Sequence, residues 1–366
     1  MVTGGGTAGH VLPALSVAEA LVAAGHDPDT VHYVGSRRGI ETRLLPDTPY
    51  PHTFYDVVGF QRSLSRRNLG FVPKMWRARR EAIALLRRLE PQVVVSVGGY
   101  ASMPVVFAAR TLGVPVVVVS YDFVPGRASQ LTARSAAACA VAFENSPLPN
   151  AEVTGAPVRQ EILTLDRDRD RTAARERLGV PADRFLLAVM GGSLGSGVLN
   201  GAIAGYVAAR RHDSGLAVRQ VAGERFIDAV ETVGGGDASG VLHQVVGYED
   251  DMPAVYAAAD LLIGRGGAST VHEVAVTGVP AVLVPWSGAA DDHQTENVRW
   301  LSEVGGAILM TEGQLASDLA DRIDALRDDP DERERLADAA RRRGEVHRSG
   351  ALATLIERVA LASSPR

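Results

Sequence analysis

The sequence contains a single cysteine, Cys139, which lies in the small-residue run SAAACA. One cysteine excludes an intramolecular disulfide framework and a cysteine-rich metal site, and among alanines it is expected to be a small buried apolar residue. No continuous apolar stretch reaches the roughly 20 residues that a membrane-spanning helix needs. Met1 leads directly into VTGGGTAGH, without the charged and apolar leader of a secretion signal. We therefore expect a cytoplasmic protein.

Signatures of several enzyme classes are also missing. The glycine-rich stretch Gly191–Gly195 lacks the Gly-Lys-Ser/Thr ending of a P-loop, which argues against ATP hydrolysis, and no His-x-x-x-His occurs. The side chains of Asp291 and Asp292 diverge as neighbours do, so we interpret them as loop polarity rather than as metal ligands. The net charge of −5 gives no nucleic-acid signature. No metal, no resident cofactor and no nucleic-acid partner are expected.

The chain alternates strand and helix signals, and it does so twice. With 366 residues, of which 46% are hydrophobic, it is long enough for two domains. Valine runs such as PQVVVSVGGY and VPVVVVS indicate parallel strands covered on both faces. The pattern restarts near Thr154, where the hinge TGAPVRQEI precedes DRDRDRTAARERLG, a segment that we expect to be charged and solvated. We predict an α/β fold of two Rossmann-like, doubly wound domains facing across a cleft.

The first glycine-rich loop matches the dinucleotide fingerprint, Gly4-x-Gly6-x-x-Gly9. A nicotinamide site needs an acidic residue at the end of the second strand, where this chain has Gly35–Arg38, a sequence that suits only a 2′-phosphate. An NADP-dependent oxidoreductase therefore stays an alternative. His10 follows the loop and can act as a general base on a hydroxyl. Its other interpretation is a histidine that only caps or packs.

Two later loops suit an anionic ligand. The stretch Gly191–Gly195 offers backbone amides and the hydroxyl of Ser193 for a diphosphate. The turn 264–268 opens a predicted helix at 269–277, where Ser269 and Thr270 are expected to cap the helix and Glu273 lies one turn further on. An ordinary βαβ turn is the alternative for this second stretch.

A basic segment with interspersed apolar residues spans 59–88, with nine basic residues and one acid. It includes Phe71, Met75 and Trp76. Such a segment can lie on an anionic membrane surface, where each cation contributes about 1 kcal/mol. Nucleic acid and a plain solvated amphipathic helix are the alternatives.

These motifs, in this order, resemble the MurG family of bacterial peptidoglycan glycosyltransferases: GGGTAGHVLPALSVAEAL, VVSVGGYASMP, GAPVRQEIL, GGSLGSGVLN, DDMPAVYAAADLLIGRGGASTVHEVAVTGVPAVLVPW and DDHQTENV. The resemblance implies a GT-B fold that needs no metal in its site. The implied reaction is the inverting transfer of N-acetylglucosamine from UDP-N-acetylglucosamine to the muramyl 4-hydroxyl of an undecaprenyl-diphosphate-linked MurNAc-pentapeptide (lipid I to lipid II).

The resemblance also implies a domain organisation. It comprises an acceptor- and membrane-facing domain at 1–155, a UDP-sugar-binding domain at 156–340, and a C-terminal helix at 341–366 that packs back on the first domain. The implied location is the cytoplasmic side of the bacterial cell membrane, as a peripheral protein.

Site residues are carried over by motif. On the donor side, the Ser193 loop would bind the diphosphate with Arg159, Glu249 would present its backbone to uracil, Glu273 would accept the ribose hydroxyls, and Gln294 with His293 would hold the sugar. The full donor set is Arg159, Gly192, Ser193, Glu249, Ala268, Ser269, Thr270, Glu273, His293 and Gln294. His10 would be the catalytic base. The acceptor and its diphosphate would be bounded by Thr7, Ala8, Gly9, Gly98, Gly99, Tyr100 and Asp122.

The chain departs from the family pattern at the acceptor side. Family members usually show His-Glu-x-Asn before the Pro-Gly that corresponds to Pro125-Gly126, and this chain has Val119–Asp122 there. A carboxylate at Asp122 would repel a diphosphate unless it is protonated or paired. The departure leaves open a related enzyme that uses a UDP-sugar on another acceptor, or a nucleotide-sugar-binding paralogue without turnover.

Overall fold

The computed structural model of the chain describes residues 1–6, 8–57, 71–233 and 239–362. It divides the protein into two compact units. Unit 1 contains Met1–Gln160 and Val346–Arg366, and unit 2 contains Glu161–Glu345. These borders lie five residues from the ones expected from the sequence, 155 and 340.

Unit 1 is built on a parallel sheet of seven strands in the order β3-β2-β1-β4-β5-β6-β7. Its strands are β1 (Val2–Thr3), β2 (Tyr33–Ser36), β3 (His52–Tyr55), β4 (Val94–Ser96), β5 (Val116–Ser120), β6 (Ala138–Val141) and β7 (Ala151–Val153). Its longer helices are α1 (Ala8–Ala23), α3 (Phe71–Leu89), α4 (Met103–Leu112), α5 (Arg127–Ala133) and α14 (Ala351–Ala362), and α2 (Glu41–Leu44) is a single turn.

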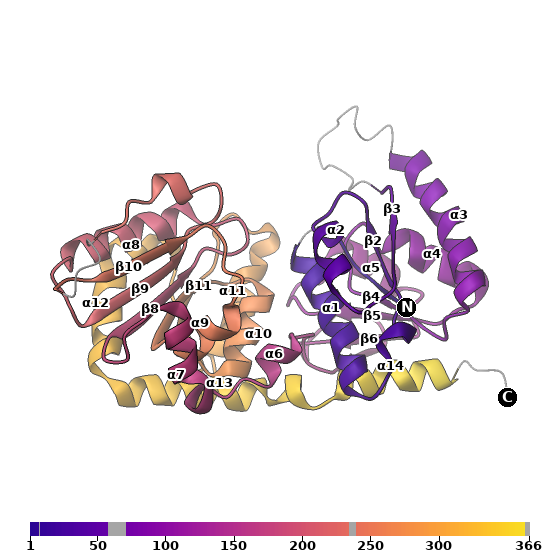
Figure 1. Cartoon of the computed structure of the whole chain (residues 1–366). Helices are drawn as coiled ribbons and strands as arrows, with labels where there is room; N and C mark the ends of the chain where they lie inside the picture. The colour runs from indigo at the N-terminus through magenta and orange to yellow at the C-terminus, as the bar shows by residue number, and fades with distance from the viewer. Residues whose placement is uncertain (7, 58–70, 234–238, 363–366) are drawn as a thin grey trace. The chain divides into compact units, whose positions relative to one another are not determined.

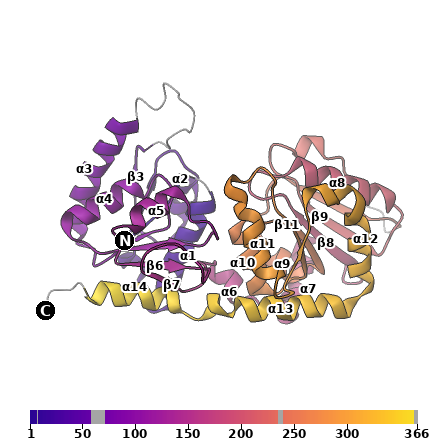
Figure 2. The same cartoon turned by 180° about the vertical axis from the view of Figure 1, so that it is seen from behind.

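Helices lie on both sides of this sheet (Figures 1 and 2). On one side α3 and α4 pack together over strands β4 and β5, and their apolar residues form one cluster with the strand valines. On the other side α14 lies against α1 and β6. The valine runs thus form fully buried strands, as the sequence predicted. Cys139 on β6 is 0% exposed, which confirms its predicted burial.

Unit 2 repeats this architecture with six parallel strands in the order β10-β9-β8-β11-β12-β13. The strands are β8 (Phe185–Met190), β9 (Leu216–Val221), β10 (Leu242–Val246), β11 (Leu261–Arg265), β12 (Ala281–Val284) and β13 (Ile308–Leu309). The helices are α6 (Gln160–Leu163), α7 (Arg167–Leu178), α8 (Gly197–Ala209), α9 (Met252–Ala258), α10 (Ala268–Thr277), α11 (His293–Ser302), α12 (Leu315–Asp328) and α13 (Pro330–Arg348). Both α6 and α13 run across a border between the units. The predicted class of two doubly wound α/β domains is confirmed.

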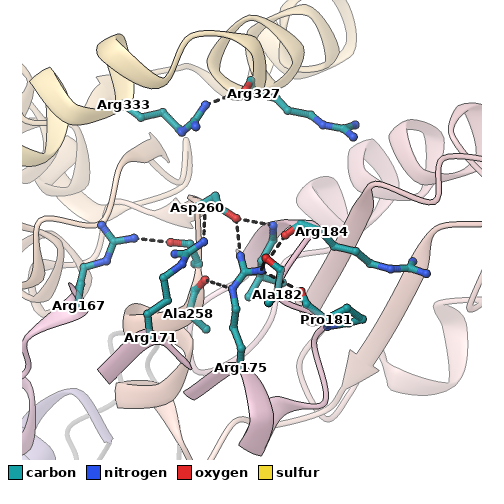
Figure 3. Close-up of polar contacts among 12 residues, drawn as sticks. Arg167, Arg171, Arg175, Pro181, Ala182, Arg184, Ala258, Asp260, Arg327 and Arg333 are labelled. Atoms are coloured by element: carbon teal, nitrogen blue, oxygen red, sulfur yellow. Dashed lines mark hydrogen bonds and ion pairs between the residues drawn. The ribbon is translucent and has the colours of Figure 1, made fainter. Parts of the chain in front are cut away.

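The arginine-rich segment that opens unit 2 is only partly solvated, contrary to expectation. It forms α7, and Figure 3 shows three of its arginines, Arg167, Arg171 and Arg175, turned toward Asp260 and the carbonyl groups around it. The Arg175 side chain is 4% exposed and donates to Asp260 at 2.6 Å and to the carbonyl oxygens of Pro181 and Arg184 at 2.9 and 2.8 Å. Arg167 donates to the carbonyl of Tyr256 at 3.0 Å. These arginines satisfy carbonyl groups that helix and strand ends leave without backbone partners.

Candidate functional site

In unit 2, the loop Gly191–Gly195 is folded so tightly that its glycines are obligatory. A Cβ at Gly195 would lie 2.2 Å from the carbonyl oxygen of Ala222, and one at Gly191 would lie 2.5 Å from the amide of Ser196. Gly192 and Gly195 also have φ of 79° and 71°, which favours glycine. Ser193 is exposed, and Ser196 caps α8 by accepting from the Leu199 amide at 3.3 Å. The loop therefore displays Ser193 at the N-terminal end of α8, where an anion is favoured.

A buried arginine, which the sequence did not single out, lies behind this loop. Arg265, the last residue of β11, is 8% exposed and donates to Ser196 Oγ at 2.6 Å. Its second partner is Glu312, at 2.6 Å. Burial acts to raise the pKa of Glu312, but the hydrogen bonds from Ser287 and Arg265 outweigh it and hold that pKa below its usual value. The Arg265 guanidinium thus holds Ser196, the N-cap residue of α8, in place. The sequence signals Arg265 only by its position at the end of a strand, directly before Gly266.

The start of α10 differs from the prediction. Its N-cap is Gly267, at φ −65° and ψ 143°, and no side chain caps the helix there. The expectation that Ser269 and Thr270 cap the helix is wrong, because the helix already begins at Ala268 and both lie in its first turn. Ser269 is exposed, and the Thr270 methyl group packs over β11. The positive end of this helix is consequently left without a side-chain cap.

Glu273, one turn further along α10, is held by a residue that sequence reasoning missed. The hydroxyl of Tyr256 on α9 donates to Glu273 Oε2 at 2.7 Å, and Tyr256 is 0% exposed. Glu273 itself is half-buried. The hydrogen bond from Tyr256 fixes the orientation of the Glu273 carboxylate, which can then accept hydrogen bonds from the hydroxyl groups of a ligand in a defined geometry.

Glu249 follows β10, and its side chain is fully engaged in shaping the turn into α9. It accepts from Arg219 Nε at 2.6 Å and from the amide of Asp251 at 3.1 Å. Asp251 in turn caps α9 by accepting from the Ala254 amide at 3.0 Å. The side chain is thus not available to read a base, and the role of the Glu249 backbone in doing so stays a prediction.

The loop before α11 brings Gln294 next to an exposed tryptophan. The amide of Trp286 donates to Gln294 Oε1 at 2.9 Å, and Trp286 is 51% exposed. His293 is the first residue of α11 and is half-buried. Asp291 and Asp292 adopt left-handed φ of 55° and 50°, so both serve the sharp turn that leads into the helix. Trp286 was not identified from the sequence.

In unit 1, His10 lies in the first turn of α1 against the second glycine turn. A Cβ at Gly99 would lie 3.4 Å from His10 Cγ and 2.5 Å from the carbonyl oxygen of Gly5. Gly98 and Gly99 have φ of 88° and 76°. Burial lowers the pKa of His10 below its usual 6.5, and the charge of Asp122 acts in the opposite direction. A neutral imidazole of this kind can accept a proton from a hydroxyl.

Three tyrosines hold the loop that precedes His10. Tyr33 donates to the carbonyl of Gly4 at 2.8 Å, and Tyr121 donates to the carbonyl of Gly9. The ring of Tyr100 lies over Gly6, where a Cβ would come within 2.5 Å of it.

The remaining predicted acceptor residues lie around this loop. Thr7 lies outside the described residues, and Ala8 is the first residue of α1. Asp122 follows Tyr121 directly and acts on His10 electrostatically. Arg159 belongs to unit 1 and is half-buried, so its pairing with a donor diphosphate stays a prediction.

The predicted membrane segment is described only from residue 71, since 58–70 lie outside the described residues. Its helix α3 begins at Phe71. Trp76 is 58% exposed, with the Arg80 guanidinium 4.9 Å from its ring centre, and Met75 is half-buried. Of the helices that the structure describes, none is long and apolar enough to cross a membrane. Within the same residues, no three His, Cys, Asp or Glu side chains gather as a metal site requires.

Comparisons with known proteins cover nearly the whole chain. The model of the glycosyltransferase family 28 N-terminal domain matches residues 1–141, and that of the C-terminal domain matches residues 186–351. The chain is 38% identical to a UDP-N-acetylglucosamine–N-acetylmuramyl-(pentapeptide) pyrophosphoryl-undecaprenol N-acetylglucosamine transferase of Clavibacter sepedonicus, over 100% of this chain and 97% of that protein. The protein of the same name from Desulforudis audaxviator is 34% identical, over 98% of each chain.

Solved structures agree with the sequence comparison. The crystal structure of Acinetobacter baumannii MurG matches with a TM-score of 0.70 and 27% identity, over 98% of each chain. Two parallel-sheet units with these neighbours constitute the GT-B fold that the sequence predicted. The alternative of an NADP-dependent oxidoreductase is wrong, and the end of β2 agrees: Arg37 donates to Phe54 and Arg38 to Asp56, at 3.0 and 2.9 Å. The chain belongs to glycosyltransferase family 28, within the family of MurG-type N-acetylglucosamine transferases.

Proposed function

We propose that this protein transfers N-acetylglucosamine from UDP-N-acetylglucosamine to the 4-hydroxyl of a muramyl sugar carried on a polyprenyl diphosphate, with inversion at the anomeric carbon. The observation that carries the chemistry is the position of His10, half-buried against Gly98 and Gly99 in unit 1, where burial lowers its pKa. The observation that carries the substrates is the match of the full chain to transferases whose names specify them.

Donor binding is assigned to unit 2. The uncapped start of α10 and the Ser193 loop at the start of α8 both present positive helix ends, which suit the two phosphates of UDP. Glu273, steadied by Tyr256, accepts the ribose hydroxyls. Gln294, with His293 beside it, holds the hydroxyls of the sugar. The turn at Glu249 presents its backbone to uracil.

The reaction is a single displacement. The acceptor oxygen attacks the anomeric carbon, its proton passes to His10, and the bond to the UDP oxygen breaks with its electron pair leaving on UDP. The helix ends of unit 2 stabilise the negative charge that develops on the departing diphosphate. Because burial holds the pKa of His10 below 6.5, the histidine is ready to accept the proton at neutral pH.

The decisive test compares acceptors. The purified protein is incubated with UDP-N-acetylglucosamine and a short-chain lipid I analogue, and UDP and disaccharide are measured. We expect stoichiometric release of both, a β-linked product by NMR, and a loss of turnover in His10→Ala of about 100-fold or more. UDP release only with an unrelated acceptor would assign a different acceptor to the enzyme. Full turnover of His10→Ala would remove His10 as the base.

We further propose that unit 1 binds the cytoplasmic face of an anionic membrane through α3, where Trp76 is exposed among basic residues. The double variant Met75→Ser/Trp76→Ser should lose most of its binding to vesicles that contain anionic phospholipid. Leu361→Ser is the matched control, since Leu361 is a 71% exposed apolar residue on α14. Equal vesicle binding of the double variant and the control would refute this surface. Nucleic acid is not an expected partner.

A further inference from the structure

Unit 1 contains a fully buried carboxylate that the proposed reaction does not use. Glu41, the first residue of α2, is 0% exposed. Its Oε1 accepts from the amide of Ser36 at 2.7 Å and from that of Gly6 at 3.2 Å, and its Oε2 lies 3.4 Å from the same Gly6 amide. Among the described residues no lysine or arginine pairs with Glu41, so backbone amides alone stabilise this charge. A buried carboxylate without hydrogen bonds would be strongly unfavourable.

The surrounding chain is shaped around this side chain. A Cβ at Gly39 would lie 1.8 Å from Glu41 Oε2, one at Gly5 would lie 2.4 Å from Oε1, and one at Gly35 would lie 3.0 Å from Cγ. Larger residues at these three positions would collide with the carboxylate or its stem. Gly5 follows β1, Gly35 lies in β2 and Gly39 follows β2, and these two strands are parallel neighbours.

The location of this carboxylate is chemically informative. In a dinucleotide-binding unit, the glycine loop after the first strand presents its amides to a phosphate. Here the sequence matches that fingerprint, but the amides of Gly6 and of Ser36, the last residue of β2, already donate to Glu41. We propose that Glu41 is a built-in anion that takes the place of a nucleotide phosphate in the first glycine loop, closing that loop to nucleotides and fixing it in the conformation that seats His10.

The second part of the proposal follows from the connections of the loop. Gly6 is packed beneath Tyr100, the carbonyl of Gly5 touches the Gly99 turn, and Gly99 contacts the His10 ring. Releasing Gly6 from Glu41 would therefore loosen the surface against which His10 rests. Glu41 acts through the loop and touches no reacting atom, which makes it a positioning residue.

Hydrogen exchange tests the proposal without reference to turnover. We compare the wild type with Glu41→Ala, Glu41→Gln and the control Glu152→Gln, whose carboxylate pairs with Arg358 on the surface of unit 1. UDP is present at saturation so that unit 2 is filled. The amides of Gly6 and Ser36 should exchange at least 10-fold faster in Glu41→Ala, less so in Glu41→Gln, and unchanged in Glu152→Gln. Added inorganic phosphate should slow their exchange in Glu41→Ala only.

Each other outcome overturns the proposal. Unchanged exchange in both Glu41 variants would show that the carboxylate does not hold the loop. Failure of phosphate to protect these amides in Glu41→Ala, or equal protection in the wild type, would show that the site is not a phosphate position. If Glu41→Ala does not fold, Glu41→Gln, which keeps the shape of the side chain, decides whether the carboxylate holds the loop. Protection by phosphate is then tested with Glu41→Asp, which has a shorter side chain.

Kinetics test the link to His10. In Glu41→Gln we expect kcat to fall about 100-fold, the effect of a misplacement of roughly 1 Å. The donor KM should stay unchanged, because donor binding is assigned to unit 2 and Glu41 belongs to unit 1. A kcat equal to that of Glu152→Gln, or a matching rise in the donor KM, would contradict this role. Absence of turnover even in the wild type would refute the proposed function and leave the exchange experiment to decide on Glu41.

Discussion

The hydroxyl of Tyr256 provides a sharp test of the donor site, because it orients Glu273 without being expected to touch the ligand. Tyr256→Phe removes one hydrogen bond of 2.7 Å from a buried phenol to the carboxylate. A hydrogen bond to a charged group contributes about 1.5–3 kcal/mol. Glu273 is half-buried, so water can replace part of this, and we take the lower end. Without this bond UDP must itself order the carboxylate on binding, and if that ordering costs the same about 1.5 kcal/mol, the Kd for UDP weakens roughly 10-fold.

The matched control is Tyr206→Phe. Tyr206 is also a buried tyrosine of unit 2, 3% exposed, and it donates to Asp324 at 2.9 Å on the face formed by α8 and α12. Both variants lose a tyrosine–carboxylate hydrogen bond and are expected to lose similar stability. Only Tyr256→Phe should weaken the binding of UDP.

Isothermal titration with UDP and 2′-deoxy-UDP makes the reasoning refutable. If Glu273 accepts the ribose hydroxyls, the preference for UDP over the deoxy compound should shrink in Tyr256→Phe. A UDP affinity within twofold of the wild type would contradict the role of Glu273. An equal loss of affinity for UDP and 2′-deoxy-UDP would also contradict this role of Glu273.

Three further predictions concern charge. In Asp122→Asn the pKa of His10 should fall further, because burial already lowers it and Asp122 acts to raise it. The acid limb of the pH–rate profile should therefore move to lower pH, and the plateau rate should drop. An acid limb at the wild-type pH would contradict the interaction between Asp122 and His10. Arg175→Met should destabilise unit 2 by about 1–3 kcal/mol and lower its melting midpoint by about 2–12 °C, because Asp260 keeps Arg171 as a partner but the carbonyl groups of Pro181 and Arg184 lose theirs. The exposed Arg169→Met should leave the midpoint unchanged. His243 is buried with its pKa lowered below 6.5, so the unfolded state binds its proton more readily, and the stability of unit 2 should fall as the pH drops below about 6.5; denaturant titrations of His243→Gln should show a flatter dependence.

The elements of the fold were predictable because their signals are local. Uninterrupted valines gave β4 and β5, and glycines marked the turns after β1, β4 and β8. The start of α10 was mispredicted for an equally local reason. Ser269 and Thr270 are good capping residues, but the extended conformation of Gly267 allows the helix to begin before them.

The supports of the site were not predictable, because they join residues far apart in the chain. The contacts Tyr256–Glu273 and Arg265–Glu312 depend on how α9, α10 and the segment after β13 are packed. The same holds for the arginines of α7: their composition predicted a solvated helix, and only the presence of Asp260 and nearby carbonyl groups explains the burial of Arg175. Periodicity does not encode such pairings.

The two opening loops of the chain illustrate why similar motifs differ in function. Both consist of a strand, a glycine turn and a helix, and their sequences gave each a plausible phosphate site. Behind the first loop the structure places a buried carboxylate, Glu41, on the amide of Gly6. Behind the second it places a buried guanidinium, Arg265, which reaches the start of α8 through Ser196. In the first loop the amide of Gly6 is already occupied by the carboxylate of Glu41, whereas behind the second loop Arg265, although paired with Glu312, supplies a donor rather than an acceptor. The buried partner of each loop, rather than its glycine pattern, therefore favours the assignment of UDP to unit 2.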